Sequence, residues 1–291
     1  MGKCLVTKLN GTVNNSSILR LGEMRFKVSK VDAPTEGTQL LGLFVNAPSK
    51  VEIIGDGYFT DKTLQENKGK SLSIDSTTNG IFVSSTSDVE VALLGKYAIT
   101  RINSYYNGQP NDTIYNKNKS FNIDDLKYST ALTTLSLSNA QISGDIANLK
   151  NLTALTTLGL YNTQTPLTGN IDELSVLSKC TEMSFKYSKL TGNLAILPSV
   201  CRFVSFFRDK GSVFTWGTRS SSAKIIAIEG NATLNNIDKM LQEQAQCQVG
   251  FSSSDNVWYK TISVTGNRTS ASDTAVQTLQ SKGYTVSITP A

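Results

Sequence analysis

The chain has 291 residues, a formal net charge of +5 and a charged fraction of 18%, with its lysines and arginines scattered. This modest and dispersed charge gives little support to binding of nucleic acid or of an anionic membrane surface. The absence of histidine removes the commonest general base and the commonest zinc ligand, and the four cysteines form no CxxC pair, so we expect no metal site and no cofactor.

Residues 1–101 contain eight short apolar segments separated by turn signals such as "NAPS" and "TTNG". This pattern predicts a mainly β domain, a β-sandwich with the jelly roll as one form of it. The first segment, "CLVTKL", is too short for a signal peptide, and no segment approaches the length of a membrane span, so we expect neither secretion nor membrane insertion. Residues 102–120 are Asn-rich and polar, which predicts a linker.

From residue 121 onward, pairs of apolar residues recur at intervals typical of a stacked repeat. The intervals are 23, 25, 21 and 22 residues, followed by 36 and 24. The pairs are Leu135/Leu137, Leu158/Leu160, Met183/Phe185, Val204/Phe206, Ile226/Ile228, Ile262/Val264 and Val286/Ile288. Because alternate residues of a strand point to one face, stacking should align the first residue of each pair, from Leu135 to Ile226, in one buried column.

Each unit should continue with a bend and a return segment, and the glycines of "SGDI", "TGNI" and "TGNL" suit the bend. The segment "RDKGSVFTWGTRSSS" loses the return pattern and predicts one irregular unit. Two later segments predict helices that cap the stack, the second starting at Ser270 or Ser272 and stopping at Gly283. Their inward residues should be Ile237, Met240 and Leu241 in the first helix, and Ala275, Val276 and Leu279 in the second.

The position three residues before each pair forms a further column. It holds Leu132, Leu155, Cys180, Cys201, Ala223 and Tyr259. We interpret Cys180 and Cys201 as small buried apolar side chains. A disulfide between neighbouring layers is the alternative, against which the expected lack of a secretory route argues.

The other face of the same strands should carry the candidate binding residues. An outermost set consists of Ser138, Tyr161, Lys186, Phe207 and Glu229, and a middle set consists of Ser136, Ser184 and Ser205 with Gly159 and Ala227. Small residues beside larger ones predict a shallow shelf, with Tyr161 and Phe207 as anchors for protein or sugar. The alternative is that these aromatic rings only shield the neighbouring strand.

No arrangement of residues predicts an enzyme. The paired carboxylates Asp124–Asp125 and Asp172–Glu173 are adjacent in sequence, so the two members of a pair cannot easily act on one reacting group. We interpret them as solvated turn residues.

The repeats resemble leucine-rich repeats. "LTTLSL" and "LTTLGL" carry the LxxLxL pattern, and "LTGNI" and "LTGNL" are similar to its LxGxI variant. The resemblance implies a β/α solenoid over residues 121–291. Members of this family usually carry an asparagine ladder where this chain has Ala140, Thr163 and Ser188, so we expect the ladder to be incomplete in the middle units.

Nearly the whole chain also resembles the leucine-rich-repeat proteins of Bacteroides and of phages that infect Bacteroidota, including crAss-like phages. The segments that carry this resemblance include "CLVTKLNGTV", "LGEMRFKV", "GDGYFTD", "GKYAIT", "FNIDDLKY" and "GNRTSASDTAVQTLQSKGYTVSITPA". It implies a non-enzymatic virion protein (a head fibre, capsid decoration or tail appendage) that assembles in the bacterial host cytoplasm.

In that role, the N-terminal domain would attach to other capsid or tail proteins, and the repeats would face a host-surface glycan or protein. A homo-oligomer would strengthen weak contacts by linking them. The alternative is a bacterial leucine-rich-repeat interaction protein, an adhesin-like binder at the cell surface or derived from a prophage.

Overall fold

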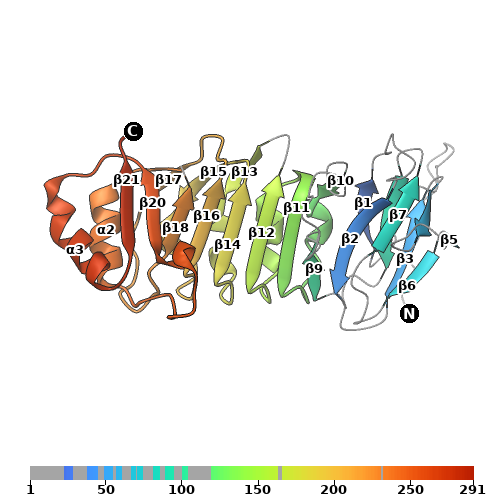
Figure 1. Cartoon of the computed structure of the whole chain (residues 1–291), viewed down its shortest axis with the longest axis horizontal. Coiled ribbons are helices and arrows are strands. Elements are labelled where there is room, and N and C mark those ends of the chain that lie inside the picture. The colour runs from blue at the N-terminus through green and yellow to red at the C-terminus, as the bar shows by residue number, and fades with distance from the viewer. Residues whose placement is uncertain are drawn as a thin grey trace, which may run out of the picture.

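The computed structural model describes residues 23–28, 38–44, 49–54, 57–60, 67–69, 71–74, 81–85, 89–94, 100–103, 119–162, 166–230 and 232–291. These residues form a mostly β structure with few helices, in which a large parallel sheet extends along the longest axis (Figure 1). The predicted strand "CLVTKL" and most of the predicted linker lie outside the described residues. No helix among the described residues combines the length and the apolar character that crossing a membrane requires.

The strands of the N-terminal region pair antiparallel. They are β1 Glu23–Val28, β2 Thr38–Phe44, β3 Ser49–Ile54, β4 Gly57–Thr60, β5 Asn67–Gly69, β6 Ser71–Ile74, β7 Ile81–Ser85 and β8 Val89–Leu94. In one set, β8 lies between β1 and β3, and β3 also pairs with β6. In the other set, β7 lies between β2 and β4, and β4 also pairs with β5. Within the described residues, the predicted segments from "MRFKVSKV" to "VEVALLG" therefore do contain strands.

From residue 101 onward, strands of successive units pair parallel, and we call this sheet the front ladder. Its strands are β9 Arg101–Asn103, β11 Thr134–Ser143, β12 Thr157–Asn162, β14 Glu182–Lys186, β16 Phe203–Phe207, β18 Ala227–Gly230, β20 Thr261–Thr265 and β21 Thr285–Thr289. Each strand pairs with the next in this order. Figure 1 shows them side by side from the N-terminal region to the C-terminal helices.

The predicted buried column is present, with one correction. Leu135 faces Leu158, Leu158 faces Met183, and Met183 faces Val204. Val204 then faces Ile228 and not Ile226, so the spacing of apolar pairs predicted the wrong partner. The column continues from Ile228 through Ile262 to Val286. All but Val286 are at most 1% exposed, which makes this column the spine of the core.

The change of pairing at Ile226 has a cause later in the chain. The side chain of Gln244 accepts a hydrogen bond from the Ile226 N–H at 2.7 Å and donates one to the Ile226 carbonyl at 3.1 Å. Because both backbone groups of Ile226 are bound in this way, the pairing of β18 Ala227–Gly230 with β16 begins one residue later, at Ala227. The spacing of apolar residues in the sequence could not reveal these hydrogen bonds of the Gln244 side chain.

A second parallel set, the side ladder, follows the front ladder around the bend of each unit. It consists of β10 Lys119–Asn122, the C-terminal half of β11, β13 Leu167–Asn170, β15 Ser188–Asn193, β17 Val213–Thr215 and β19 Thr233–Leu234. Four 3-10 helices then return the chain, namely η4 Ile123–Leu126, η5 Ile146–Asn151, η6 Ile171–Val176 and η7 Leu194–Ile196. The units up to η7 therefore consist of strand, bend, strand and return helix, and the later units depart from this pattern.

The return helices share one polar cap. Asn122, Asp145, Asn170 and Asn193 each accept a hydrogen bond from the backbone N–H two residues later. Neighbouring units are linked here as well, because Asp124 Oδ1 accepts the Asp145 N–H at 2.9 Å and Asp172 Oδ1 accepts the Asn193 N–H at 2.6 Å. Asp124 and Asp172 therefore link neighbouring units. The interpretation of these two residues as solvated turn residues was incomplete, because their carboxylates bind backbone of the next unit.

A threonine ladder fixes the start of the front strands. The backbone N–H and the hydroxyl of Thr156 both donate to the Thr133 carbonyl, at 2.8 and 3.0 Å. Thr181 makes the same pair of bonds to Thr156, and Thr133 makes it to Thr100. In the next unit Arg202 takes this position and retains the backbone bond to Thr181, at 2.9 Å. The position of Arg202 in this series directs its side chain toward a different partner, described below.

The irregular unit predicted around residues 208–222 is held by a buried arginine. Arg219 is 5% exposed, and its guanidinium donates to backbone carbonyls on both sides of it. These carbonyls belong to Ala195, Leu197, Pro198, Cys201 and Lys224, at distances of 3.0 to 3.3 Å. The guanidinium thus donates hydrogen bonds to backbone carbonyls that would pair with backbone N–H groups in a unit with a regular return helix.

Two α-helices close the stack as predicted. They are α2 Ile237–Gln246 and α3 Asp273–Ser281, which lie at the C-terminal end in Figure 1. The first buries Ile237, Met240 and Leu241, and the second buries Ala275 and Leu279, with Val276 half-buried. Ser272 is the N-cap residue of α3, and Gly283, at φ +90°, follows its end.

The cysteines lie in the core as free thiols. Cys180 and Cys201 are both 0% exposed, and neither forms a disulfide. Burial raises the pKa of Cys180 to about 12 and the pKa of Cys201 to about 11. This confirms the interpretation of these two cysteines as small buried side chains.

Candidate binding surface

The candidate site is the side of the front ladder that faces away from the core, which we call the front face. Strand alternation places its side chains in three rows. The first row holds Thr134, Thr157, Glu182, Phe203 and Ala227, the second holds Ser136, Gly159, Ser184, Ser205 and Glu229, and the third holds Tyr161, Lys186 and Phe207. Ser138 pairs with Tyr161 along the backbone, but its side chain lies outside the described set.

Tyr161 lies against its own strand. A Cβ added to Gly159 would come within 2.8 Å of the Tyr161 ring carbon Cε2, so the ring lies over this glycine. Tyr161 is half-buried, and its ring covers backbone that no other side chain of β12 could cover at that position. The ring therefore shields the backbone at Gly159, as the alternative interpretation expected, and the anchor role of Tyr161 stays a prediction.

Lys186 lies between two aromatic residues. It pairs with Tyr161 on one side and with Phe207 on the other, and adjacent strands are about 4.8 Å apart. Phe207 is 50% exposed, an unusual exposure for a phenylalanine in the middle of a sheet. The third row is thus aromatic, cationic and aromatic in succession.

Glu229 is on the front face but in a different row from the one that the sequence predicted. Glu229 pairs with Ser205 in the second row. The register of β18 against β16 differs by two residues from the predicted one, since Val204 pairs with Ile228 and not with Ile226. Burial raises the pKa of Glu229, and a hydrogen bond from Ser205 opposes that rise. Three of the predicted middle residues, Ser136, Ser184 and Ser205, do lie together in this row.

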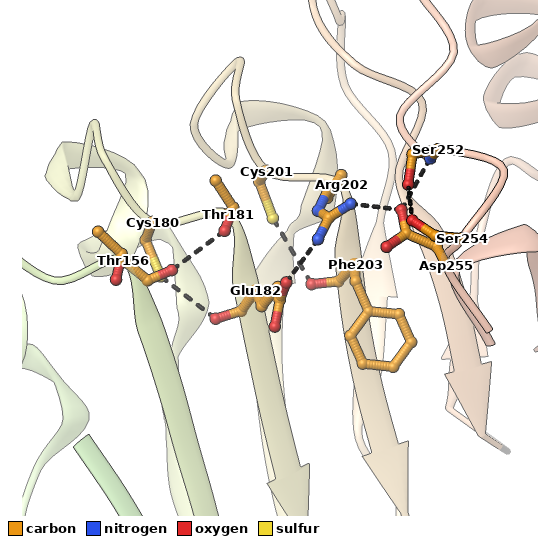
Figure 2. Close-up of polar contacts among 10 residues, drawn as sticks. All are labelled: Thr156, Cys180, Thr181, Glu182, Cys201, Arg202, Phe203, Ser252, Ser254 and Asp255. Carbon is orange, nitrogen blue, oxygen red and sulfur yellow. Dashed lines mark hydrogen bonds and ion pairs between the residues drawn. The ribbon is translucent and has the colours of Figure 1, made fainter. Parts of the chain in front are cut away.

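A charged cluster that the sequence did not predict covers the C-terminal end of the front face. Figure 2 shows the guanidinium of Arg202 between two carboxylates, 2.9 Å from Glu182 and 2.6 Å from Asp255. The same guanidinium lies 4.6 Å from the ring centroid of Tyr259. Since Arg202 and Asp255 are far apart in sequence, only the substitution of arginine in the threonine ladder could have signalled the cluster.

The cluster holds residues 251–260, which we call the strap, against the sheet. Tyr259 packs on Phe203 with ring centroids 5.0 Å apart, and Phe203 is only 7% exposed as a result. Tyr259, predicted to point inward before Ile262, therefore contacts the front face instead. The helix η8 Val257–Lys260 contacts β18, and its Trp258 is 55% exposed. The strap therefore covers the first row of the front face at β16 and lies against β18.

Several carboxylates of the described residues make contacts within the fold. The described residues contain no cluster of three or more Cys, Asp or Glu side chains that could hold a metal ion. Glu182 and Asp255 are both paired with Arg202, and Glu243 of α2 accepts from Trp216 and from the Arg219 backbone, each at 2.9 Å. These carboxylates hold the fold together.

Comparison with known proteins gives no family. No protein-family model matches the chain, and no curated protein matches it.

Proposed function

We propose that this chain is a non-enzymatic binding protein with a leucine-rich-repeat solenoid, and that it belongs to a phage virion as a head fibre, capsid decoration or tail appendage. The repeated unit of strand, bend, strand and return helix supports the solenoid, because leucine-rich repeats pair a strand with a helix or 3-10 segment in each unit. The resemblance to phage and Bacteroides repeat proteins supports the virion assignment.

The observation that carries the binding role is the front face. Across β11–β16 it presents the partly exposed serines Ser136 and Ser184, two aromatic rings and Lys186 on a ladder of paired strands. Rigid side chains of this kind bind a partner with a small loss of conformational entropy. The N-terminal strands, with their two antiparallel sets, are consistent with a β-sandwich, and we assign that domain to attachment to other virion proteins. Homo-oligomers on the particle would add avidity.

Mass spectrometry of purified virions, combined with localisation of the chain by cryo-electron microscopy, tests the assignment. We expect the chain in stoichiometric amounts on the particle, with residues 121–291 facing outward and the N-terminal region in contact with a capsid or tail protein. Detection of the protein in phage-free cultures alone would contradict the virion role and favour a bacterial interaction protein.

A further inference from the structure

The turn between the front and side ladders carries a cluster of cations next to the third row. Lys186 ends β14, and Lys189 lies three residues later in β15; Arg208 and Lys210 follow the end of β16 in the next unit. We call Lys186, Lys189, Arg208 and Lys210 the cationic corner. Register and hydrogen bonding bring the two units together, since Lys186 faces Phe207 and the Lys210 N–H donates to the Ser188 carbonyl at 2.7 Å.

The charges of the cationic corner are not neutralised within the part of the chain that the structure describes. None of the ion pairs there involves any of its four members. Asp209, the carboxylate within this segment, accepts from the Gly211 N–H, the Ser212 N–H and the Ser212 hydroxyl. The ammonium of Lys210 lies 4.6 Å from the ring centroid of Tyr187, which positions it without removing its charge.

The neighbouring groups define what an occupant must offer. Phe207, half exposed, and the ring of Tyr161 over Gly159 suit an apolar ring face, and the partly exposed hydroxyl of Ser184 suits a hydrogen-bonding group. The four cations suit separated negative charges, because lysine binds an anion as a point charge. An acidic protein segment would satisfy the cations but would find little apolar area here, since protein interfaces need larger buried anchors.

We propose that the third row and the cationic corner bind an anionic polysaccharide of uronate type, whose sugar rings stack on Tyr161 and Phe207 while its carboxylates meet the cationic corner. This inference rests on the proposed binding role of the front face and specifies the class of ligand. Glu229 in the second row repels such a ligand, so the chain of sugars lies over the third row.

Binding of oligogalacturonate to the full chain, measured by isothermal titration calorimetry, tests the proposal. The methyl-esterified oligosaccharide is the matched ligand control, because it keeps the rings and loses the charges. We expect binding of the free acid alone, weakened as NaCl rises from about 50 mM to about 500 mM, since salt screens exposed charges. Equal binding of both ligands, or of neither, would overturn the proposal.

Variants test whether the third row and the cationic corner form the binding site. Lys186→Ala with Lys189→Ala should weaken binding about tenfold, a loss of about 1.4 kcal/mol. Phe207→Ala should weaken it about as much through loss of stacking, while Glu229→Gln should strengthen it about two- to threefold. Lys179→Ala, at an exposed lysine beyond the opposite end of β14, should change nothing.

Three outcomes distinguish failure of the ligand class from failure of the virion role. If poly-glutamate binds equally well and Phe207→Ala has no effect, the surface recognises acidic protein and the sugar proposal fails. If oligogalacturonate binds as expected but the chain is missing from virions, the virion role fails while the ligand class stands. If the chain is on virions but binds neither ligand, only the ligand class fails.

Discussion

The side-chain amide of Gln244 binds both backbone groups of Ile226, accepting from its N–H at 2.7 Å and donating to its carbonyl at 3.1 Å. A side chain on a helix thereby takes the role of a neighbouring strand. Both residues are fully buried, so water cannot replace either bond.

Gln244→Ala should therefore destabilise the protein more than an ordinary helix substitution. It leaves a buried N–H and a buried carbonyl unpaired, which we expect to lower the free energy of unfolding by about 2–4 kcal/mol. Urea unfolding followed by circular dichroism measures the change. The control is Gln246→Ala, at an exposed position of the same helix, and equal losses in the two variants would contradict this role of Gln244.

The shape of the Arg219 guanidinium should matter more than its charge. Lysine carries the same charge but cannot reach five carbonyls, so Arg219→Lys should lower the free energy of unfolding by about 3 kcal/mol or more. Arg208→Lys, the same change at an exposed position, should be within about 0.5 kcal/mol of the unmodified protein. Thermal and urea unfolding of the two variants decide the question.

Alanine variants of Gly144 and Gly211 distinguish the cost of backbone strain from the cost of steric crowding. The φ angles of the two glycines are +102° and +100°, so alanine is strained at both. A Cβ at Gly144 would also collide with Asn122 and Asp124, whereas at Gly211 it would meet nothing within 4 Å. We expect Gly144→Ala to cost about 1–3 kcal/mol more stability than Gly211→Ala. Similar losses would show that the polar cap tolerates a methyl group.

Cys180 and Cys201 should be inert in the folded protein. Burial raises the pKa of Cys180 from 9.0 to about 12, so its thiol stays protonated at pH 8 and reacts only after unfolding. Iodoacetamide labelling, with peptide mass spectrometry of each cysteine, should show protection that urea abolishes. Labelling of either cysteine in native protein at the rate seen in urea would refute this expectation.

The same raised pKa values set a pH dependence with a definite sign. Below pH 9.0 both thiols are protonated in the folded and the unfolded chain, so their contribution to stability is fully present. As the pH rises from 9.0 toward the folded-state pKa values of about 11 and about 12, only the unfolded chain ionises, and stability should fall. The slope of unfolding free energy against pH in this window should be shallower in Cys201→Ala.

Asp255→Asn should loosen the strap without unfolding the stack. The Ser252 N–H, followed by the charge of Arg202, lowers the pKa of Asp255, so the carboxylate stays charged and paired with Arg202 at pH values below the ordinary pKa of an aspartate. The stability that this pairing contributes is fully present above that ordinary pKa and is lost as pH falls through the lowered pKa. We expect faster hydrogen exchange in residues 251–260 of the variant and unchanged exchange in β11–β14. Uniform acceleration would instead mean that the cluster stabilises the whole fold.

Much of the front face was predictable. Alternation in "TTLGLY" and "TEMSFK" places Tyr161 and Lys186 on one face of paired strands, and the recurring apolar pairs put them side by side. Glu229 was placed in the wrong row because the unit before it has an irregular return, and apolar spacing measures sequence distance and not backbone pairing. The strap was missed because nothing local distinguishes Asp255 from any other acidic turn residue.

The sequence by itself determined the period, the inward column up to Val204, the bends and the two capping helices, since each depends on residues within one unit. Only the tertiary structure decided the pairing at Ile226, the burial of Arg219 and the closure of the front face by Arg202 and Asp255. These features depend on which backbone and charged groups remain without partners after the units stack. These groups find their partners in distant segments of the chain, so no local pattern of residues predicts the pairing.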